Sequence, residues 1–477
     1  MKKLTLLALF TLGLVGCKNQ PAMEWISTTP NACWQSQQPV VATTTDEVPD
    51  LIVLPHETKQ QIDGFGGCFN EMGWVALQSL PDTAKISIMR ELFDSNLGAS
   101  FTICRTPIGA NDFSRDWYSY DEVEGDFQLA NFSIKNDEET LIPYIKSALS
   151  VNPSLKLWAS PWSPPAWMKK NKHYACASSD NNVNQALHNG LSIYNQGAEG
   201  TDLFITDSAH FDAYARYFAK YIDAYRKQGI EISAVMPQNE FNSCQIFPSC
   251  TWTATSLASF IGDYLGPEMQ KQNVSVMLGT MERPDFAQID SILLDPEAKQ
   301  FISGVGFQWA GKDILKVVRE RFPLLTLYQT EQECGDGKNS WQGAEYSWNL
   351  MRFYLENGAN AYMYWNMALE KGGVSRWGWA QNSLVVVDPQ TKAYNYTYEY
   401  YVMKHASHFV KPGASVVTTQ GTYKDAIAFV NLDGSMVLLV ANTTDNAATI
   451  NTAVDKTLYR LSLAPHSINT FLIKKEV

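Results

Sequence analysis

The sequence is poor in the residues that build metal sites and disulfide scaffolds. Its 477 residues include eight cysteines and seven histidines, with no paired C-x-x-C motif and no H-E-x-x-H motif. We therefore expect no metal site. His405 and His408 form an H-x-x-H pattern in an apolar context, which favours packing over metal ligation. Cys244 and Cys250 are close enough in sequence to form a disulfide, and the sequence leaves this open.

Positive charge is scarce as well. Lys and Arg total 37 against 49 Asp and Glu, which gives a formal net charge of -12. Such a chain is not drawn to the phosphates of nucleic acid or to an anionic membrane surface, and we expect neither as a partner of the folded domain. Hydrophobic residues make up 45% of the chain, which excludes wholesale disorder.

Apolar runs long enough to span a bilayer are missing too, because a span needs about 20 residues. The run from Leu4 to Val15 is shorter and follows two lysines, which is typical of a signal peptide. Its end, Leu14-Val15-Gly16-Cys17, resembles a bacterial lipobox. The resemblance implies that residues 1–17 are a lipoprotein signal with Cys17 as the lipidated residue. We expect an exported protein, periplasmic or surface-facing, that meets the membrane only through this anchor. An ordinary signal with a chance cysteine is the alternative.

Strand and helix patterns alternate over most of the chain. Residues 18–50 are polar, and we interpret them as a tether and the first sandwich residues, followed by a sandwich strand at 51–61. Residues 62–392 contain eight short apolar runs separated by helical periodicity, which is typical of a (β/α)₈ barrel. The eight expected strands are Phe65–Asn70, Phe101–Gly109, Lys156–Ser163, Ser233–Glu240, Val274–Met281, Gly304–Ala310, Leu325–Glu331 and Ala361–Met367.

The pattern changes again near residue 392. Residues 393–477 contain short β-prone runs separated by Gly, Asp, Asn or Pro, which predicts a small antiparallel β-sandwich. Leu51–Leu54 is expected to add a strand to it from the other end of the chain. The fold class is therefore α/β, a TIM barrel with a side sandwich formed by both chain ends. The segment Lys169–Leu203 is long and aperiodic, and we interpret it as a substrate-shaping loop at the barrel mouth, with a mobile insertion as the alternative.

Two glutamates end two of the expected barrel strands. Glu240 follows Gln238-Asn239, and Glu331 follows Thr330. Acids at the carboxyl ends of barrel strands project into the mouth, and two such carboxyl groups suffice for glycoside hydrolysis if their pKa values differ. Glu333 has the same strand parity as Glu331, so parity alone does not choose between them.

These residues belong to a larger set of motifs. It comprises Asp63-Gly64-Phe65-Gly66-Gly67, Ala159-Ser160-Pro161-Trp162-Ser163-Pro164-Pro165, Gln238-Asn239-Glu240, Thr330-Glu331 and Tyr364-Trp365-Asn366. In this order the set resembles glycoside hydrolase family 30, which contains glucosylceramidases and β-1,6-glucanases. The resemblance covers nearly all of the chain beyond the signal. It implies a (β/α)₈ barrel with a side β-sandwich, which agrees with the periodicity.

The resemblance implies a role for each matching residue. Glu240 matches the acid/base, Glu331 the nucleophile, and Asn239 a ligand of the sugar 2-hydroxyl. Family members retain anomeric configuration, which implies carboxyl groups about 5–5.5 Å apart. Because Glu331 matches the family's Thr/Ser-Glu pattern, it is preferred to Glu333.

Other matches concern substrate binding. Glu71 stands where glucosylceramidases carry a sugar-binding aspartate, and Trp162 and Trp365 match aromatic walls of the sugar site. Arg105 is a candidate to orient the nucleophile, with a structural ion pair as the alternative. The family has a His-Trp-Tyr pattern at the sixth strand. This chain keeps its tryptophan as Trp309 but has Gln308 in place of the histidine and Ala310 in place of the tyrosine. Trp377 and Trp379 are candidates for a rim platform, or they pack the barrel against the sandwich.

The sequence thus predicts a retaining β-glycosidase that acts on β-glucosidic linkages, either glucosylceramidase-like or a β-1,6-glucanase. Its partner is a β-linked glycan or glycolipid, and no cofactor is implied because two carboxyl groups suffice. The alternatives are a β-xylosidase or β-fucosidase of the same family, or a non-catalytic glycan-binding lipoprotein. Another barrel enzyme would need a Schiff-base lysine or clustered histidines at the strand ends, and neither occurs in the eight strands.

Overall fold

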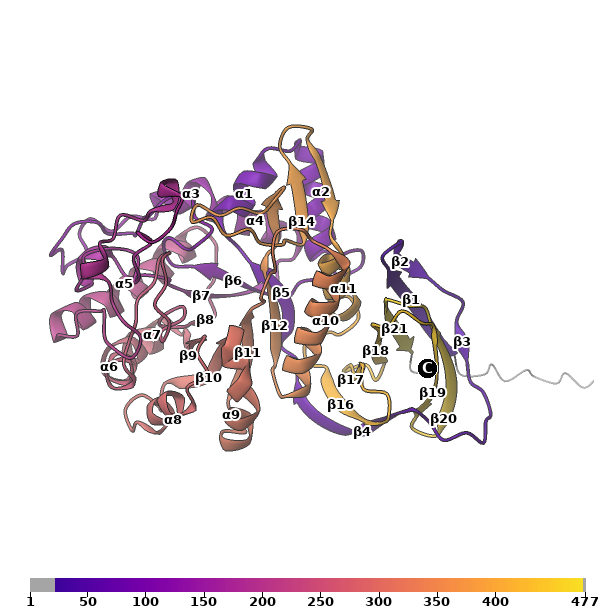
Figure 1. Ribbon diagram of the computed structural model, residues 1–477. Coiled ribbons are helices and arrows are strands. Elements are labelled where there is room, and N and C mark those ends of the chain that lie inside the picture. The colour runs from indigo at the N-terminus through magenta and orange to yellow at the C-terminus, as the bar shows by residue number, and fades with distance from the viewer. Residues whose placement is uncertain (1–21, 475–477) are drawn as a thin grey trace, which may run out of the picture.

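The structure is a computed structural model that describes residues 22–474. It contains a closed barrel and a β-sandwich, with α10 (Trp341–Glu356) and α11 (Tyr398–Ser407) between them (Figure 1). The expected signal segment and Cys17 lie outside the described residues. Among the helices within 22–474, none combines the length and the apolar character needed to cross a bilayer.

Eight parallel strands close the barrel, in agreement with the eight runs expected from the sequence. In barrel order they are β5 (Gly64–Cys68), β6 (Ile103–Pro107), β7 (Lys156–Ser160), β8 (Ala234–Val235), β9 (Ser275–Met281), β10 (Ile302–Gln308), β11 (Thr326–Glu331) and β12 (Ala361–Asn366). Gly66 allows β5 to lie close to β6, because a Cβ there would be 1.7 Å from the carbonyl oxygen of Ile103. β8 is much shorter than the expected Ser233–Glu240, since Pro237 has no N–H to continue the ladder.

Helices cover the outside of the barrel. They are α1 (Glu71–Gln78), α2 (Asp82–Phe93), α3 (Lys135–Glu139), α4 (Leu141–Val151), α5 (Ser208–Lys227), α6 (Ala254–Ser259), α7 (Gly266–Gln272), α8 (Phe286–Leu294) and α9 (Leu315–Arg321). A π-helical turn (Phe260–Leu265) joins α6 to α7, and a 3-10 turn (Trp309–Ile314) precedes α9. In α5, the Asp207 side chain caps the first turn by accepting from the His210 N–H. The aromatic positions spaced three and four apart on α5 are buried, as its periodicity predicts.

Both chain ends build the sandwich, as expected. Its strands are β1 (Ala22–Thr29), β2 (Ala32–Ser36), β3 (Val40–Val41), β4 (Leu51–Gln61), β16 (Ser415–Gly421), β17 (Ala426–Val430), β18 (Met436–Asn442), β19 (Ala448–Val454), β20 (Thr457–Leu463) and β21 (Ser467–Ile473). Most pairs are antiparallel, but β4 and β19 run parallel. Segment 18–50, interpreted partly as a tether, contributes three strands, and β1 lies between β2 and β21.

Helix α11 fastens the sandwich to the barrel through a buried histidine. His405 Nδ1 lies 2.7 Å from Thr470 Oγ1 on β21, and Nε2 lies 2.8 Å from Thr28 Oγ1 on β1. The H-x-x-H pattern therefore serves packing, as expected. Burial lowers the pKa of His405 to about 3.

Two further segments follow barrel strands. A small sheet of β13 (Ala368–Glu370), β14 (Val385–Asp388) and β15 (Ala393–Tyr396) comes after β12. The aperiodic segment 169–203 contains only short 3-10 turns, at Gln185–Leu187 and Ile193–Asn195, after another at Ala166–Met168. It begins at Lys169, whose side chain is fully buried.

Candidate active site

Glu331 lies at the carboxyl end of β11 with both carboxylate oxygens bonded. Arg105 Nη1 donates to Oε2 at 3.0 Å, and Trp309 Nε1 donates to Oε1 at 3.2 Å. Arg105 has no exposed surface and Glu331 has 5%, so this ion pair is shielded from water. Charge-assisted bonds of this kind fix both the position and the ionised state of a carboxylate.

Glu240 lies in the turn after β8 and is held differently. Its backbone has φ of +50°, a left-handed conformation that a non-glycine residue adopts only at a cost. Gln308 Nε2 donates to Oε1 at 3.0 Å. The other oxygen, Oε2, is buried and has no hydrogen-bond partner within residues 22–474. No cation pairs with this carboxyl group in that part of the chain, which favours its protonated form.

The two glutamates therefore differ in electrostatic environment. Burial raises the pKa of Glu240 well above its ordinary value, and the charges of Glu331 and Glu282 raise it further. Burial also raises the pKa of Glu331, but the Arg105 guanidinium and the Trp309 N–H oppose this effect. These environments favour a proton on Glu240 over one on Glu331, the order that a general acid and a nucleophile require.

Arg105 on β6 connects several of the expected site residues. Its Nη2 donates to Asn239 Oδ1 at 2.6 Å and to Ser160 Oγ at 2.9 Å. The guanidinium also lies over the Trp162 ring, 4.1 Å from its centroid. The structure thus places Arg105 against Glu331, as its proposed orienting role requires.

Asn239 is oriented by its side-chain oxygen. Besides Arg105, Thr280 Oγ1 donates to Oδ1 at 3.0 Å and Gln308 Nε2 at 3.2 Å. No described residue accepts a hydrogen bond from the amide nitrogen of Asn239. The residue is therefore fixed with its donor available for a substrate hydroxyl.

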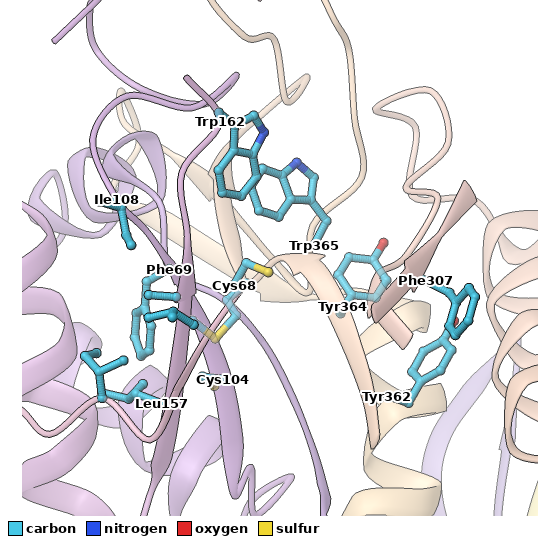
Figure 2. Packing of buried hydrophobic residues seen from close by; sticks show 14 of the residues in the cluster. Cys68, Phe69, Cys104, Ile108, Leu157, Trp162, Phe307, Tyr362, Tyr364 and Trp365 are labelled. Carbon is cyan, nitrogen blue, oxygen red and sulfur yellow. The ribbon is translucent and has the colours of Figure 1, made fainter. Parts of the chain in front are cut away.

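Trp162 and Trp365 lie together above the strand ends (Figure 2). Their rings stack with centroids 5.3 Å apart at 26°, and each residue is 1% exposed. Trp309 is half-buried, has φ of +49° and follows β10, the strand beside β11, and its indole N–H donates to Glu331. Trp309 thus contacts Glu331 directly, whereas Trp162 packs on Arg105, which pairs with Glu331, and Trp365 packs on Trp162.

Glu71 is not part of this group, contrary to expectation. It has no exposed surface, and it accepts hydrogen bonds from Arg115 N and Nε, Asn136 Nδ2 and Thr140 Oγ1 at 2.9–3.0 Å. A sugar hydroxyl has no access to such a carboxylate. Glu71 is instead a structural acid that ties α1 to the segment after β6.

The choice between Glu331 and Glu333 is clear in the structure. Glu333 forms an ion pair with Lys312 at 2.9 Å and a hydrogen bond with the Tyr346 hydroxyl. It contacts neither Arg105 nor Trp309 among the described interactions, whereas Glu331 contacts both. Glu331 is therefore the residue that shares the site with Glu240.

The two rim tryptophans have different environments. Trp377 is 4% exposed and packs against Trp117 with ring centroids 4.9 Å apart. Trp379 is 38% exposed and lies near Phe247. Trp379 is the more exposed of the two, so it is the better candidate for contact with a distal sugar.

Two acidic residues near the site were missed by the sequence analysis. Asp112, after β6, is buried with Oδ1 unpartnered, and burial and the Glu331 charge raise its pKa well above the ordinary value. Glu282, after β9, is 6% exposed and pairs with Arg283 at 2.5 Å. Glu282 directly follows a barrel strand, which is the signal that would have identified it, whereas Asp112 lies five residues beyond the end of β6.

The structure also describes the cysteines and the groups that could bind a metal ion. All seven described cysteines are free thiols, so Cys244 and Cys250 are not bonded to each other. Within residues 22–474 there is no group of three or more His, Cys, Asp or Glu side chains arranged to hold a metal ion.

The chain matches two family descriptions. Residues 62–410 match "Glycosyl hydrolase family 30 TIM-barrel domain", and residues 413–471 match "Glycosyl hydrolase family 30 beta sandwich domain". The chain is 28% identical over 447 residues to putative glucosylceramidase 4 of Caenorhabditis elegans, covering 87% of this chain and 82% of the relative. It is 26% identical over 414 residues to endo-1,6-β-D-glucanase BGN16.3 of Trichoderma harzianum, covering 81% and 79%.

A solved structure agrees with these matches. The crystal structure of SrfJ from Salmonella typhimurium superposes with a TM-score of 0.84 at 25% identity, covering 95% of this chain and all of that one. The family match spans most of the chain and contains both glutamates. The chain therefore belongs to glycosyl hydrolase family 30 and is an O-glycosyl hydrolase that acts on β-glycosidic linkages.

Proposed function

We propose that the protein is a retaining β-glucosidase in which Glu240 is the acid/base and Glu331 the nucleophile. The observation that carries this proposal is the contrast between the two carboxyl groups. Glu331 is paired with a buried guanidinium at 3.0 Å, whereas Glu240 has an unpartnered buried oxygen and acidic neighbours. A double-displacement mechanism needs one ionised and one protonated carboxyl group of the enzyme beside the same glycosidic bond.

The reaction follows from these states. Glu331 attacks the anomeric carbon while Glu240 gives its proton to the leaving oxygen, and a glycosyl ester forms on Glu331. Ester formation removes the negative charge of Glu331, one of the groups that raise the pKa of Glu240. Glu240 is then a better base toward water, which attacks the ester and releases the sugar with retained configuration.

Substrate contacts are proposed for the residues around the two acids. Asn239 donates from its amide nitrogen to the sugar 2-hydroxyl, because its oxygen is occupied by Arg105, Thr280 and Gln308. The unpartnered carboxyl oxygen of Asp112 accepts from another hydroxyl of the same sugar. Relatives named as glucosylceramidases and endo-1,6-β-glucanases support a glucosidic linkage over a xylosidic or fucosidic one.

The test is the product profile from linear β-1,6-glucan, using the chain from Lys18 onward so that β1 is intact. A ladder of oligosaccharides shows an endo-glucanase, and glucose alone shows an exo-enzyme. If no product forms, glucosylceramide and aryl β-glucosides are tested next. NMR of the first-formed anomer checks retention. An inverted product, or no cleavage of any of these β-glucosides, contradicts the proposal, and Glu331→Gln is the inactive control.

We also propose that the protein is exported and anchored by lipidated Cys17, on the strength of the lipobox resemblance. In a bacterial host, the full-length chain should partition into the detergent phase of a Triton X-114 extract. Cys17→Ser should lose this partitioning and should not be processed. Equal partitioning of both forms contradicts the anchor.

A further inference from the structure

The long segment 169–203 is joined closely to the loop that carries Glu240. Lys169 is fully buried, and its Nζ donates to the Tyr174 carbonyl oxygen at 2.6 Å and to the Ser249 carbonyl oxygen at 2.7 Å. This ammonium group therefore ties the start of the segment to the end of the loop after β8. The loop begins at Glu240, so this contact holds the same loop that carries the candidate acid/base.

Backbone contacts hold the two segments side by side. Cys176 N and Ala177 N both donate to the Gln245 carbonyl oxygen, at 3.0 Å and 2.8 Å. A further antiparallel bridge pairs Ala175 with Pro248. Cys244, which precedes Gln245, is thus placed beside Cys176 although the two are far apart in sequence.

The two cysteines interact with each other and differ in their exposure to solvent. The backbone contacts at Gln245 bring the two thiols near each other, and their interaction lowers the pKa of Cys176 and raises that of Cys244. Cys176 has no exposed surface, whereas Cys244 is half-buried and open to solvent on one side. The pair therefore has one protected sulfur and one that a reagent reaches.

We propose that Cys176 and Cys244 are a redox-active pair that forms a disulfide in an oxidising compartment. The disulfide joins segment 169–203 covalently to the loop that carries Glu240. Secreted and envelope proteins form and keep such bonds, whereas cytosolic thiols remain reduced. The proposal agrees with the proposed export of the chain, but its chemistry depends on neither the export nor the glycosidase activity.

Cys250 is the competing partner, because it lies in the same loop as Cys244. Its sulfur is fully buried and contacts the Thr251 carbonyl oxygen at 3.9 Å. Burial raises the pKa of Cys250 to about 12, and the pKa of Cys244 is raised as well, so acidity does not choose between the pairings. The backbone contacts favour Cys176 over Cys250 as the partner of Cys244.

The oxidation requires a small-molecule disulfide such as oxidised glutathione. Cys244 is the cysteine that the reagent reaches, so it loses its proton to solvent and its sulfur attacks one sulfur of the reagent, which releases one glutathione thiolate and leaves a mixed disulfide on Cys244. The Cys176 thiolate then attacks Cys244 Sγ and releases the second glutathione. Two protein thiols lose two electrons and two protons, and the reagent becomes two glutathione thiols.

The experiment uses the chain from Lys18 onward, incubated with oxidised glutathione and then alkylated under denaturing conditions. Intact mass should show a species about 2 Da lighter before alkylation, with two fewer alkylated cysteines. Peptide mapping should find Cys176 linked to Cys244. The melting temperature should rise by roughly 2–5 °C on oxidation and return on reduction, because the bond restricts the unfolded chain.

Matched variants separate the possible partners. Cys176→Ser and Cys244→Ser should each abolish the linked peptide, whereas Cys250→Ser should retain it. If a variant folds poorly, the peptide map of the oxidised wild-type chain identifies the partner of Cys244 without it. A Cys244–Cys250 peptide, or a Cys244–glutathione adduct that never resolves, overturns the proposal. Because no readout uses catalysis, its failure is distinguishable from failure of the proposed function.

Discussion

Gln308 Nε2 donates a hydrogen bond to Glu240 Oε1 at 3.0 Å. The same side chain accepts from Arg105 Nη1 at 3.3 Å, and Arg105 pairs with Glu331. One neutral amide therefore connects the two carboxyl groups through the guanidinium. Because the amide is neutral at every working pH, it orients both acids without adding a charge to either.

Replacing this amide should change the pH dependence of catalysis. The hydrogen bond from Gln308 lowers the pKa of Glu240, so Gln308→Leu removes a group that favours the ionised form. We expect the alkaline limb of the kcat/KM profile to move up by roughly 0.5–1 pH unit. The check is kcat/KM for an aryl β-glucoside across pH 4–9. A downward shift, or none, contradicts this role of Gln308.

Glu282 should act with the opposite sign. Its carboxylate pairs with Arg283 at 2.5 Å, and its charge raises the pKa of Glu240. Glu282→Gln removes this charge, so the alkaline limb should move down by roughly 0.5–1 pH unit. The groups that face Glu240 besides Glu282 are Glu331 and Asp112, which both remain.

Glu333→Gln is the matched control for this experiment, because Glu333 pairs with Lys312 and is not among the groups that shift Glu240. Its profile should coincide with that of the wild type. If Glu282→Gln and Glu333→Gln give the same pH profile, the charge of Glu282 does not affect the pKa of Glu240.

Substrates with different leaving groups should distinguish the roles of the two catalytic glutamates. Glu240→Ala removes the proton donor, so unactivated glucosides should lose at least ~10³-fold in kcat/KM. Aryl glucosides with acidic phenols need little protonation and should lose far less in the glycosylation step. The measurement is a series of aryl β-glucosides of differing phenol pKa. Equal losses across the series argue against Glu240 as the acid.

Glu331→Gln should abolish activity on every leaving group, because no substitute nucleophile contacts Arg105. Glu333→Gln should stay within a few-fold of wild type on the same substrates. A mechanism-based fluoroglucoside should label Glu331, identified by peptide mass. Labelling of Glu333 instead would reverse the assignment.

The sequence predicted the barrel well because each strand combines apolar residues with turn signals, and all eight expected strands are present. It predicted less well where a contact depends on distant partners. β1 reads as polar tether, yet it pairs with β21 through the backbone, which composition does not reveal. Similarly, the resemblance placed Glu71 at the sugar, whereas Arg115 and Asn136 engage it in the structure.

In the candidate site, too, the sequence predicted residues in motifs but not contacts that depend on the fold. Glu240, Glu331 and Arg105 follow from strand ends and motif order. Asp112 was missed because it follows a loop rather than a motif, and Cys176 because its neighbour Cys244 is brought close only by the fold. Sequence parity also left Glu333 open, and the choice required the positions of Arg105 and Lys312.

His405 should make the join between barrel and sandwich sensitive to acid. Thr470 Oγ1 donates to the His405 carbonyl oxygen at 3.0 Å, so it accepts from Nδ1–H, and Nε2 accepts from the Thr28 hydroxyl. Protonation of Nε2 opposes this arrangement, which agrees with a folded-state pKa lowered to about 3 from 6.5.

The sign of the pH effect follows from this shift. Since the folded-state pKa of His405 lies below the unfolded value, its contribution to stability is present above about pH 6.5 and is lost as pH falls toward 3. His405→Gln should be less stable at pH 7, by about 1–3 kcal/mol, because it loses at least one buried hydrogen bond. Its melting temperature should also fall less steeply than that of the wild type between pH 6.5 and 4. Thermal unfolding across this range checks both, and parallel curves for the two proteins would exclude His405 as the titrating group.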